Sequence, residues 1–185
     1  SNIVHLLHYD NLLYMAFEIA SDSDAEDFDN LVFYLDTNAD EQWPTSATNE
    51  GIYVFQGNSI GGFKSVWMEN GELQVEADWQ DDTGVGMAPG LSGGKRIFEL
   101  VFDLSTSQID VSPGSSFGMF MFYYDQLPND QEELDAVWPY NAATFENCSY
   151  FGKITLGTAT NQLTAAPAEL SFAAVYKHKV RLFLK

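Results

Sequence analysis

The chain has 185 residues, enough for one domain with a sizeable hydrophobic core. Aspartate and glutamate number 27 against 8 lysines and arginines, so the formal net charge is −19 at pH 7. Such a charge repels phosphate and therefore excludes nucleic acid and anionic membrane surfaces as expected partners. The aromatic content of 15% argues against a disordered acidic chain. A single cysteine excludes an internal disulfide and a zinc site built from several thiolates.

Short runs of β-branched and aromatic residues, separated by Gly, Asn, Asp and Ser, predict strands along most of the chain. They are expected at 3–9, 12–20, 31–36, 51–56, 63–69, 72–80, 96–104, 116–125, 149–156 and 170–184. At most one short helix is expected, near 130–137, where Gln131-Glu132-Glu133-Leu134 are good helix formers. This pattern predicts an all-β fold, an antiparallel β-sandwich of the jelly-roll kind. No apolar run reaches the roughly 18 residues of a transmembrane segment.

The clearest local unit is a β-hairpin centred on Asn70-Gly71, a pair preferred in two-residue type I′ turns. Such a turn sets the register of the strands on either side of it. The predicted pairs are Met68 with Leu73, Val66 with Val75, Lys64 with Ala77, Trp67 with Gln74, Ser65 with Glu76, and Phe63 with Asp78.

The second strand of this hairpin alternates apolar residues with acidic and amide residues, which predicts that Trp79 faces inward. Trp67 and Phe63 then fall on the polar face. Aromatic rings beside amides and carboxylates suit sugar binding, because a ring stacks on a sugar face while polar groups bind hydroxyls. The candidate ligand-binding residues are Trp67, Phe63, Trp79, Gln74 and Glu76. The alternative is that another strand, loop or subunit covers these rings.

Two acidic loops flank the predicted strand at 31–36 and suggest a metal site. The segment Asp36-Thr37-Asn38-Ala39-Asp40-Glu41 offers oxygen ligands at alternate positions, as hard cations such as Ca²⁺ require. It is not an EF-hand, because Glu41 stands where that loop needs glycine. The candidate calcium ligands are Asp36, Asn38, Asp40 and Glu41, with Asp27 and Asp29 contributed by the preceding loop. The alternative is that both acidic runs are simply solvated loops.

No motif indicates an enzyme. The two G-x-S-x-G matches, at 57–61 and 90–94, lead into predicted strands, whereas a nucleophile elbow requires a helix after the serine. The acidic residues are too numerous for their spacing to select a catalytic pair.

The order of strand motifs resembles that of family 9 carbohydrate-binding modules and the related DOMON-like sandwiches. The stretches that carry the resemblance are Asn11–Ile19, Asp29–Asn38, Phe98–Leu104, Phe117–Asp125 and Tyr150–Leu156. The resemblance covers residues 3–156 and implies an extracellular or cell-surface β-sandwich, often with bound calcium, that binds sugar, or haem in some relatives. Trp67 and Trp79 are the candidates for the family's sugar-clamping tryptophans.

Two departures from that family define the expected organisation: a β-sandwich domain over 1–156 and a C-terminal extension over 157–185. We expect the family's usual opening strand to be missing before residue 3. In the extension, Lys177, Lys179, Arg181 and Lys185 alternate with apolar residues, which predicts an additional cationic strand.

Three functions follow from this organisation. The first is a non-catalytic module that binds a polysaccharide or oligosaccharide and holds structural calcium. The second is a surface or filament subunit that polymerises with copies of itself by donating the strand within 170–185. The third is a haem-binding domain, which needs axial ligands such as Met or His in a pocket. Met15, Met119 and Met121 fit a hydrophobic core better than that role.

Overall fold

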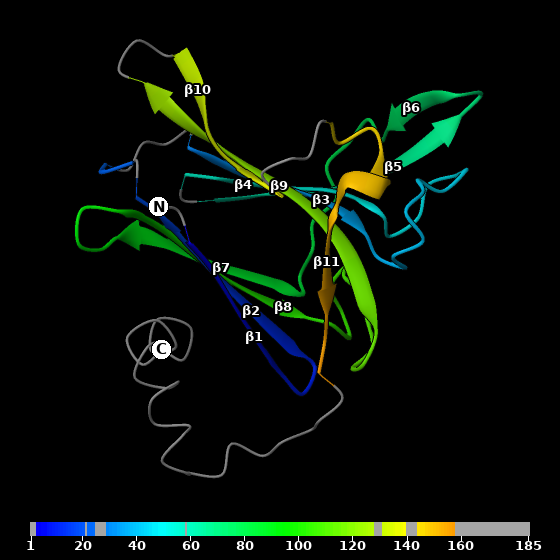
Figure 1. The fold of residues 1–185 in the computed structure, drawn as a ribbon, viewed down its shortest axis with the longest axis horizontal. Coiled ribbons are helices and arrows are strands. Elements are labelled where there is room, and N and C mark those ends of the chain that lie inside the picture. Colours follow the sequence, from blue (N-terminus) through cyan, green and yellow to red (C-terminus); the bar gives the residue numbers. More distant parts are fainter. Residues whose placement is uncertain are drawn as a thin grey trace.

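The computed structural model describes residues 3–20, 22–24, 29–57, 59–127, 131–139 and 144–157, which fold into two facing antiparallel sheets (Figure 1). The smaller sheet has the strand order β1 (Ile3–Tyr9), β2 (Leu12–Ile19), β8 (Arg96–Asp103) and β7 (Val85–Leu91). The larger sheet has the order β10 (Gln131–Trp138), β9 (Ser116–Leu127), β3 (Asn30–Asp36), β4 (Gly51–Gln56), β5 (Ser59–Glu69) and β6 (Glu72–Val75). Strand β11 (Gly152–Thr155), which follows a single 3₁₀ turn at Cys148–Tyr150, pairs with the first part of β9.

The main core lies between the two sheets, where inward side chains of both meet. The ring of Phe17 on β2 lies 5.2 Å from that of Phe33 on β3, which in turn lies 5.2 Å from Phe55 on β4. A second buried cluster lies on the outer face of the larger sheet and contains Val32, Tyr34, Trp43, Val66, Phe120 and Cys148. Strand β3 is therefore buried on both faces, which explains its unbroken apolar run.

The predicted all-β antiparallel sandwich is confirmed, and most strands begin and end within a few residues of their predicted bounds. The helix predicted near 130–137 is wrong, because Gln131–Trp138 pair with β9 as strand β10. Backbone pairing along an open sheet edge outweighs the helix propensity of this segment. Strand β7 was not predicted, because Pro89 and two glycines argue against a strand; β7 tolerates them at the edge of its sheet.

The predicted β-hairpin is confirmed near its turn. Asn70 and Gly71 both have positive φ, 53° and 83°, as a type I′ turn requires. Trp67 pairs with Gln74, and Val66 pairs with Val75. The predicted cationic strand at 170–184, and with it the proposed self-association, lies outside the described residues. Among the residues that the structure does describe, no helix has the length and apolar character needed to cross a membrane.

Candidate ligand surface and acidic sites

The β5–β6 hairpin carries the candidate sugar-binding surface and extends away from the smaller sheet (Figure 1). On one face of the hairpin, the side chains of Val66, Met68 and Leu73 pack in the cluster on the outer face of the larger sheet. Because neighbouring side chains alternate across a strand, Trp67 lies on the opposite face, where it is half-buried. Directly opposite it on β6 is Gln74, also half-buried.

Glu76 lies next to this pair on the same face, because its backbone N–H donates to Ser65 O at 3.0 Å. Its carboxylate accepts hydrogen bonds from Ser65 N at 3.3 Å and from the Gln80 side-chain amide. The carboxylate is therefore held in place beside the indole. Trp67, Gln74 and Glu76 together form what we call the hairpin surface: one aromatic ring flanked by an amide and an oriented carboxylate.

Two of the predicted ligand residues lie elsewhere. Phe63 is fully buried in the main core, with its ring 5.0 Å from that of Tyr53, so its expected exposure is wrong. Trp79 was expected to face inward but is 46% exposed, with Lys64 Nζ 4.7 Å from the centre of its ring. Of the two rings expected to form one platform, Phe63 thus lies in the core and Trp67 at the hairpin, while Trp79 lies on the other face of the hairpin.

The register of the hairpin also departs from the predicted one away from its turn. Phe63 exchanges two backbone hydrogen bonds with Gln80, at 3.0 and 2.8 Å, and not with the predicted Asp78. Two extra residues therefore lie between the regular hairpin pairs and this bridge. A shift of two residues keeps each side chain on its face, so Trp79 stays on the Lys64 side of the sheet, opposite to the face that carries Trp67. What differs from the expectation is the direction of the faces: the face with Phe63 meets the main core, and the face with Val66 packs in the outer cluster.

An acidic cluster of two buried aspartates and one half-buried aspartate joins the loop before β3 to the end of β9. Ligand atoms of Asp22, Asp29 and Asp125 lie within 4.8 Å of one another, the sole such trio of potential metal ligands in the described ranges. The hydroxyl of Tyr123 donates a hydrogen bond to Asp22, and burial raises the pKa of this phenol, which keeps it a donor. Of the six predicted metal ligands, Asp29 alone lies in this cluster; Asp27 is outside the described residues.

One cation partly balances this acidic cluster. The Arg96 guanidinium lies 3.1 Å from Asp29 Oδ2, and both side chains are fully buried. Arg96 also donates to Gly57 O at 3.0 Å and lies 4.7 Å above the ring of Phe98. Three carboxylates and one guanidinium leave a formal charge of −2, which matches a divalent cation.

The Asp36–Glu41 loop does not present the alternating ligands that its sequence suggested. The Asn38 and Asp40 side chains are exposed, and each accepts a hydrogen bond from a backbone N–H two residues later, at 2.8 and 2.9 Å. Glu41 is also exposed, whereas Asp36 is buried and accepts a hydrogen bond from Glu41 N at 2.9 Å. The loop oxygens therefore cap the loop's own backbone.

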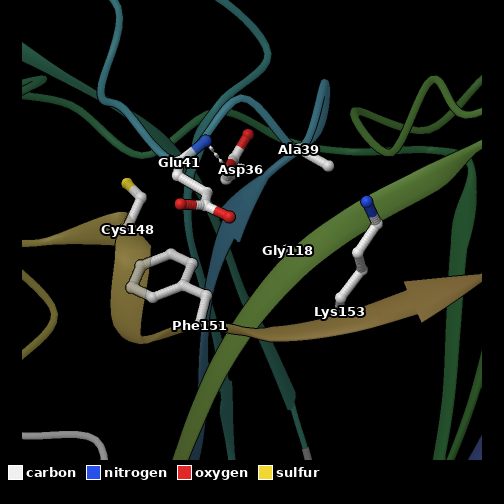
Figure 2. Close-up of a pocket in the computed structure, with 7 residues that line it drawn as sticks. All are labelled: Asp36, Ala39, Glu41, Gly118, Cys148, Phe151 and Lys153. Carbon is white, nitrogen blue, oxygen red and sulfur yellow. Dashed lines mark hydrogen bonds between the residues drawn. The ribbon is translucent and has the colours of Figure 1, made fainter.

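Asp36 lies at the wall of a small pocket of about 30 Å³ (Figure 2). Its other lining residues are Ala39, Glu41, Gly118, Cys148, Phe151 and Lys153. Sequence reasoning missed a second buried acid in this region, Glu50, whose pKa is raised to about 7 by burial and by the charges of Asp36 and Asp40. The missed signal is that Glu50 stands immediately before an apolar strand.

Two solved structures of a family 9 carbohydrate-binding module from Caldicellulosiruptor kristjanssonii are similar to this chain. The complex with glucose has a TM-score of 0.60 at 17% identity, over 88% of this chain and 80% of that one. The complex with cellotriose has a TM-score of 0.59 at 16% identity, over 89% and 79%. The chain has a fold like that of family 9 carbohydrate-binding modules.

A scan against models of protein families gave no match, and a search of curated proteins gave none. The family 9-like fold confirms the resemblance seen in the strand motifs. At 16–17% identity the likeness concerns the fold, so the chemistry of the hairpin surface has to be argued from this chain's own residues.

Proposed function

We propose that the chain is a non-catalytic carbohydrate-binding module that binds a glucose-containing oligosaccharide or polysaccharide at the hairpin surface. The observation that carries the proposal is a half-buried Trp67, flanked by Gln74 and Glu76, on a fold shared with sugar-bound modules. The indole offers an apolar face on which a pyranose ring stacks. The amide and the carboxylate offer an acceptor and donor set for its hydroxyls.

Calorimetric titration with glucose and cellotriose tests this function. We expect the wild-type protein to release heat and Trp67→Ala to bind at least tenfold more weakly, a loss of about 1.4 kcal/mol. Trp79→Ala is the matched control, because it removes an exposed indole from the opposite face and should leave the affinity within about twofold. Absence of heat across a broad sugar panel would refute the function. A loss confined to Trp79→Ala would refute the site.

We also propose that the Asp22, Asp29 and Asp125 cluster holds calcium, which would suit an extracellular or cell-surface module. Its donors are all hard carboxylate oxygens, and its net charge of −2 is what Ca²⁺ neutralises. Bound calcium would fix the loop before β3 to the end of β9, and no step of sugar binding passes through it. The role is therefore structural.

A further inference from the structure

The smaller sheet has an outer face that points away from the main core. Side chains alternate along β2 and β8, and one alternating set of them belongs to that core. The other set forms the outer face, where the register gives these cross-strand pairs: Tyr14 with Val101, Ala16 with Glu99, and Glu18 with Ile97. Neither of the two buried clusters that the described residues form covers this face.

Three residues on this outer face are nevertheless buried. Ala16 is 4% exposed, Ile97 is 7% exposed and Glu99 is 1% exposed. Glu99 pairs with Ala16 on one side and with Ala88 on the other, so the directly opposite positions offer only methyl groups beside it. Burial also raises the pKa of Tyr14 on the same face. Because a methyl group is too short to shield a glutamate, the burial of Glu99 indicates a covering layer over this face.

Strand β7 leaves room for such a layer. The residues of β7 that pair with the outward residues of β8 are Gly86, Ala88 and Gly90. None of them carries more than a methyl group, and a Cβ added to Gly86 would lie only 2.9 Å from Val101 Cγ1. A covering segment can therefore approach the sheet closely over β7 and β8.

The charge of this face favours a basic occupant. Glu18, Glu99 and Asp103 all occupy outward positions on β2 and β8, and the other outward residues of these two strands are apolar or tyrosine. Lys95 Nζ already lies 3.1 Å from the Glu18 carboxylate at the rim. A segment that combines apolar and basic side chains is therefore complementary to the face.

The last part of the chain has this composition. Half of the 8 lysines and arginines lie within the last nine residues, as Lys177, Lys179, Arg181 and Lys185, and apolar residues separate several of them. Of the 27 acidic residues, 26 precede residue 158. The segment over 158–185 is thus the basic part of an otherwise acidic chain, and attraction between the two favours their association.

The segment is also long enough to reach the face. The described residues end at Gly157, after β11, and 28 residues follow. In Figure 1 the chain leaves β11 at the end of the sandwich where β1 turns into β2. The twelve residues over 158–169 would span about 40 Å when extended, at about 3.3 Å per residue, whereas the eight residues of β8 span about 26 Å. The basic residues can therefore lie anywhere on this face.

We propose that the C-terminal segment over 158–185 docks on the outer face of the smaller sheet of its own chain. Its apolar side chains would pack on Ala16 and Ile97, and its basic side chains would face Glu99 and Glu18. The docked segment adds a layer to the sandwich and leaves the hairpin surface, on the other sheet, free for a ligand. It is then engaged within its own molecule and is not donated to a second copy.

Paramagnetic relaxation in the full-length chain tests this placement. A nitroxide is attached at His178→Cys, which keeps all four basic residues of the segment. The native Cys148 does not compete for the label, because it is buried and burial raises the pKa of its thiol. We expect the backbone amide signals of Ala16, Ile97 and Glu99 to lose at least half of their intensity. The signal of Gln74, on the hairpin of the other sheet, should keep nearly all of its intensity.

A charge reversal in the labelled chain tests the role of the basic residues. Replacing Lys177, Lys179 and Arg181 by glutamate should reduce the broadening at Ile97 and Glu99 at least threefold, because the segment would then be repelled by the face. The matched control exchanges lysine and arginine at the same three positions, which keeps the charge and should leave the broadening unchanged. All three positions lie outside the described sandwich, so the spectrum itself verifies that the fold is intact.

A mixed sample distinguishes docking within one chain from docking between copies. It combines nitroxide-labelled chain without ¹⁵N and ¹⁵N-labelled chain without nitroxide, and we expect no broadening in it. Broadening in the mixture would show that the face binds a second copy and would overturn the proposal. So would the absence of broadening at this face in the singly labelled chain, or broadening that charge reversal leaves unchanged. None of these results bears on sugar titration of the wild-type protein.

Discussion

Replacing Arg96 by methionine should destabilise the protein by about 3–5 kcal/mol, the typical loss when one partner of a buried ion pair is removed. The guanidinium is buried and lies 3.1 Å from the equally buried Asp29. Without it, the buried Asp22 and Asp29 and the half-buried Asp125 would lie close together with no guanidinium to balance their charge. Loss of the hydrogen bond to Gly57 O adds to the cost.

Urea unfolding in the presence of a chelator measures this effect without interference from bound cations. Lys95→Met is the matched control: it removes the neighbouring cation, whose ammonium lies 3.1 Å from Glu18 at a more exposed position. An exposed pair contributes at most about 1 kcal/mol, so this variant should remain close to the wild type. Equal effects of the two substitutions would show that the buried pair has no special role.

Replacing Phe63 by alanine should cost about 3–5 kcal/mol of folding free energy, as expected when a fully buried aromatic side chain is removed from a core. The ring lies between the two sheets and contacts Tyr53 at 5.0 Å, inside the main cluster. The large cavity left behind cannot be filled by backbone movement, because β5 is bonded to β4 on one side and to Gln80 on the other.

The comparison variant is Trp79→Ala, which removes a larger ring that is 46% exposed and should cost less than about 1 kcal/mol. Thermal and chemical unfolding of the two variants should therefore differ widely. A mild effect of Phe63→Ala, comparable to that of Trp79→Ala, would mean that Phe63 lies at the surface, as its place in the sequence pattern had indicated.

Alternation along each segment was sufficient to predict the sandwich, because the pleat sends neighbouring side chains to opposite faces. The hairpin register was predictable near Asn70-Gly71, where the turn fixes it. Farther from the turn it was not, because a pairing irregularity between Val54 and Phe55 and the shifted bridge of Phe63 to Gln80 depend on contacts with other strands. Phe63 and Trp79 were misplaced for a different reason: alternation separates the two faces of the hairpin but does not say which of them meets the main core, and it is the face with Phe63 that does.

The acidic sites were predictable only in part. Both acidic loops were recognised, but the partners that complete the clusters come from distant strands: Asp125 from β9 and Glu50 from the start of β4. Their pairing depends on strand order, which the local pattern does not contain. The exposed Asn38, Asp40 and Glu41 illustrate the converse, because a ligand-like spacing also suits a loop that caps its own backbone.

The central claim is that a sugar contacts the face of the hairpin that carries Trp67. It is tested most directly by following the four indole N–H signals in a ¹H–¹⁵N spectrum during titration with cellotriose, each assigned by single Trp→Phe substitution. The Trp67 signal should move saturably, while those of the buried Trp43 and of Trp79 stay in place. Saturable movement of another indole with none at Trp67, or no movement at all, would contradict the account.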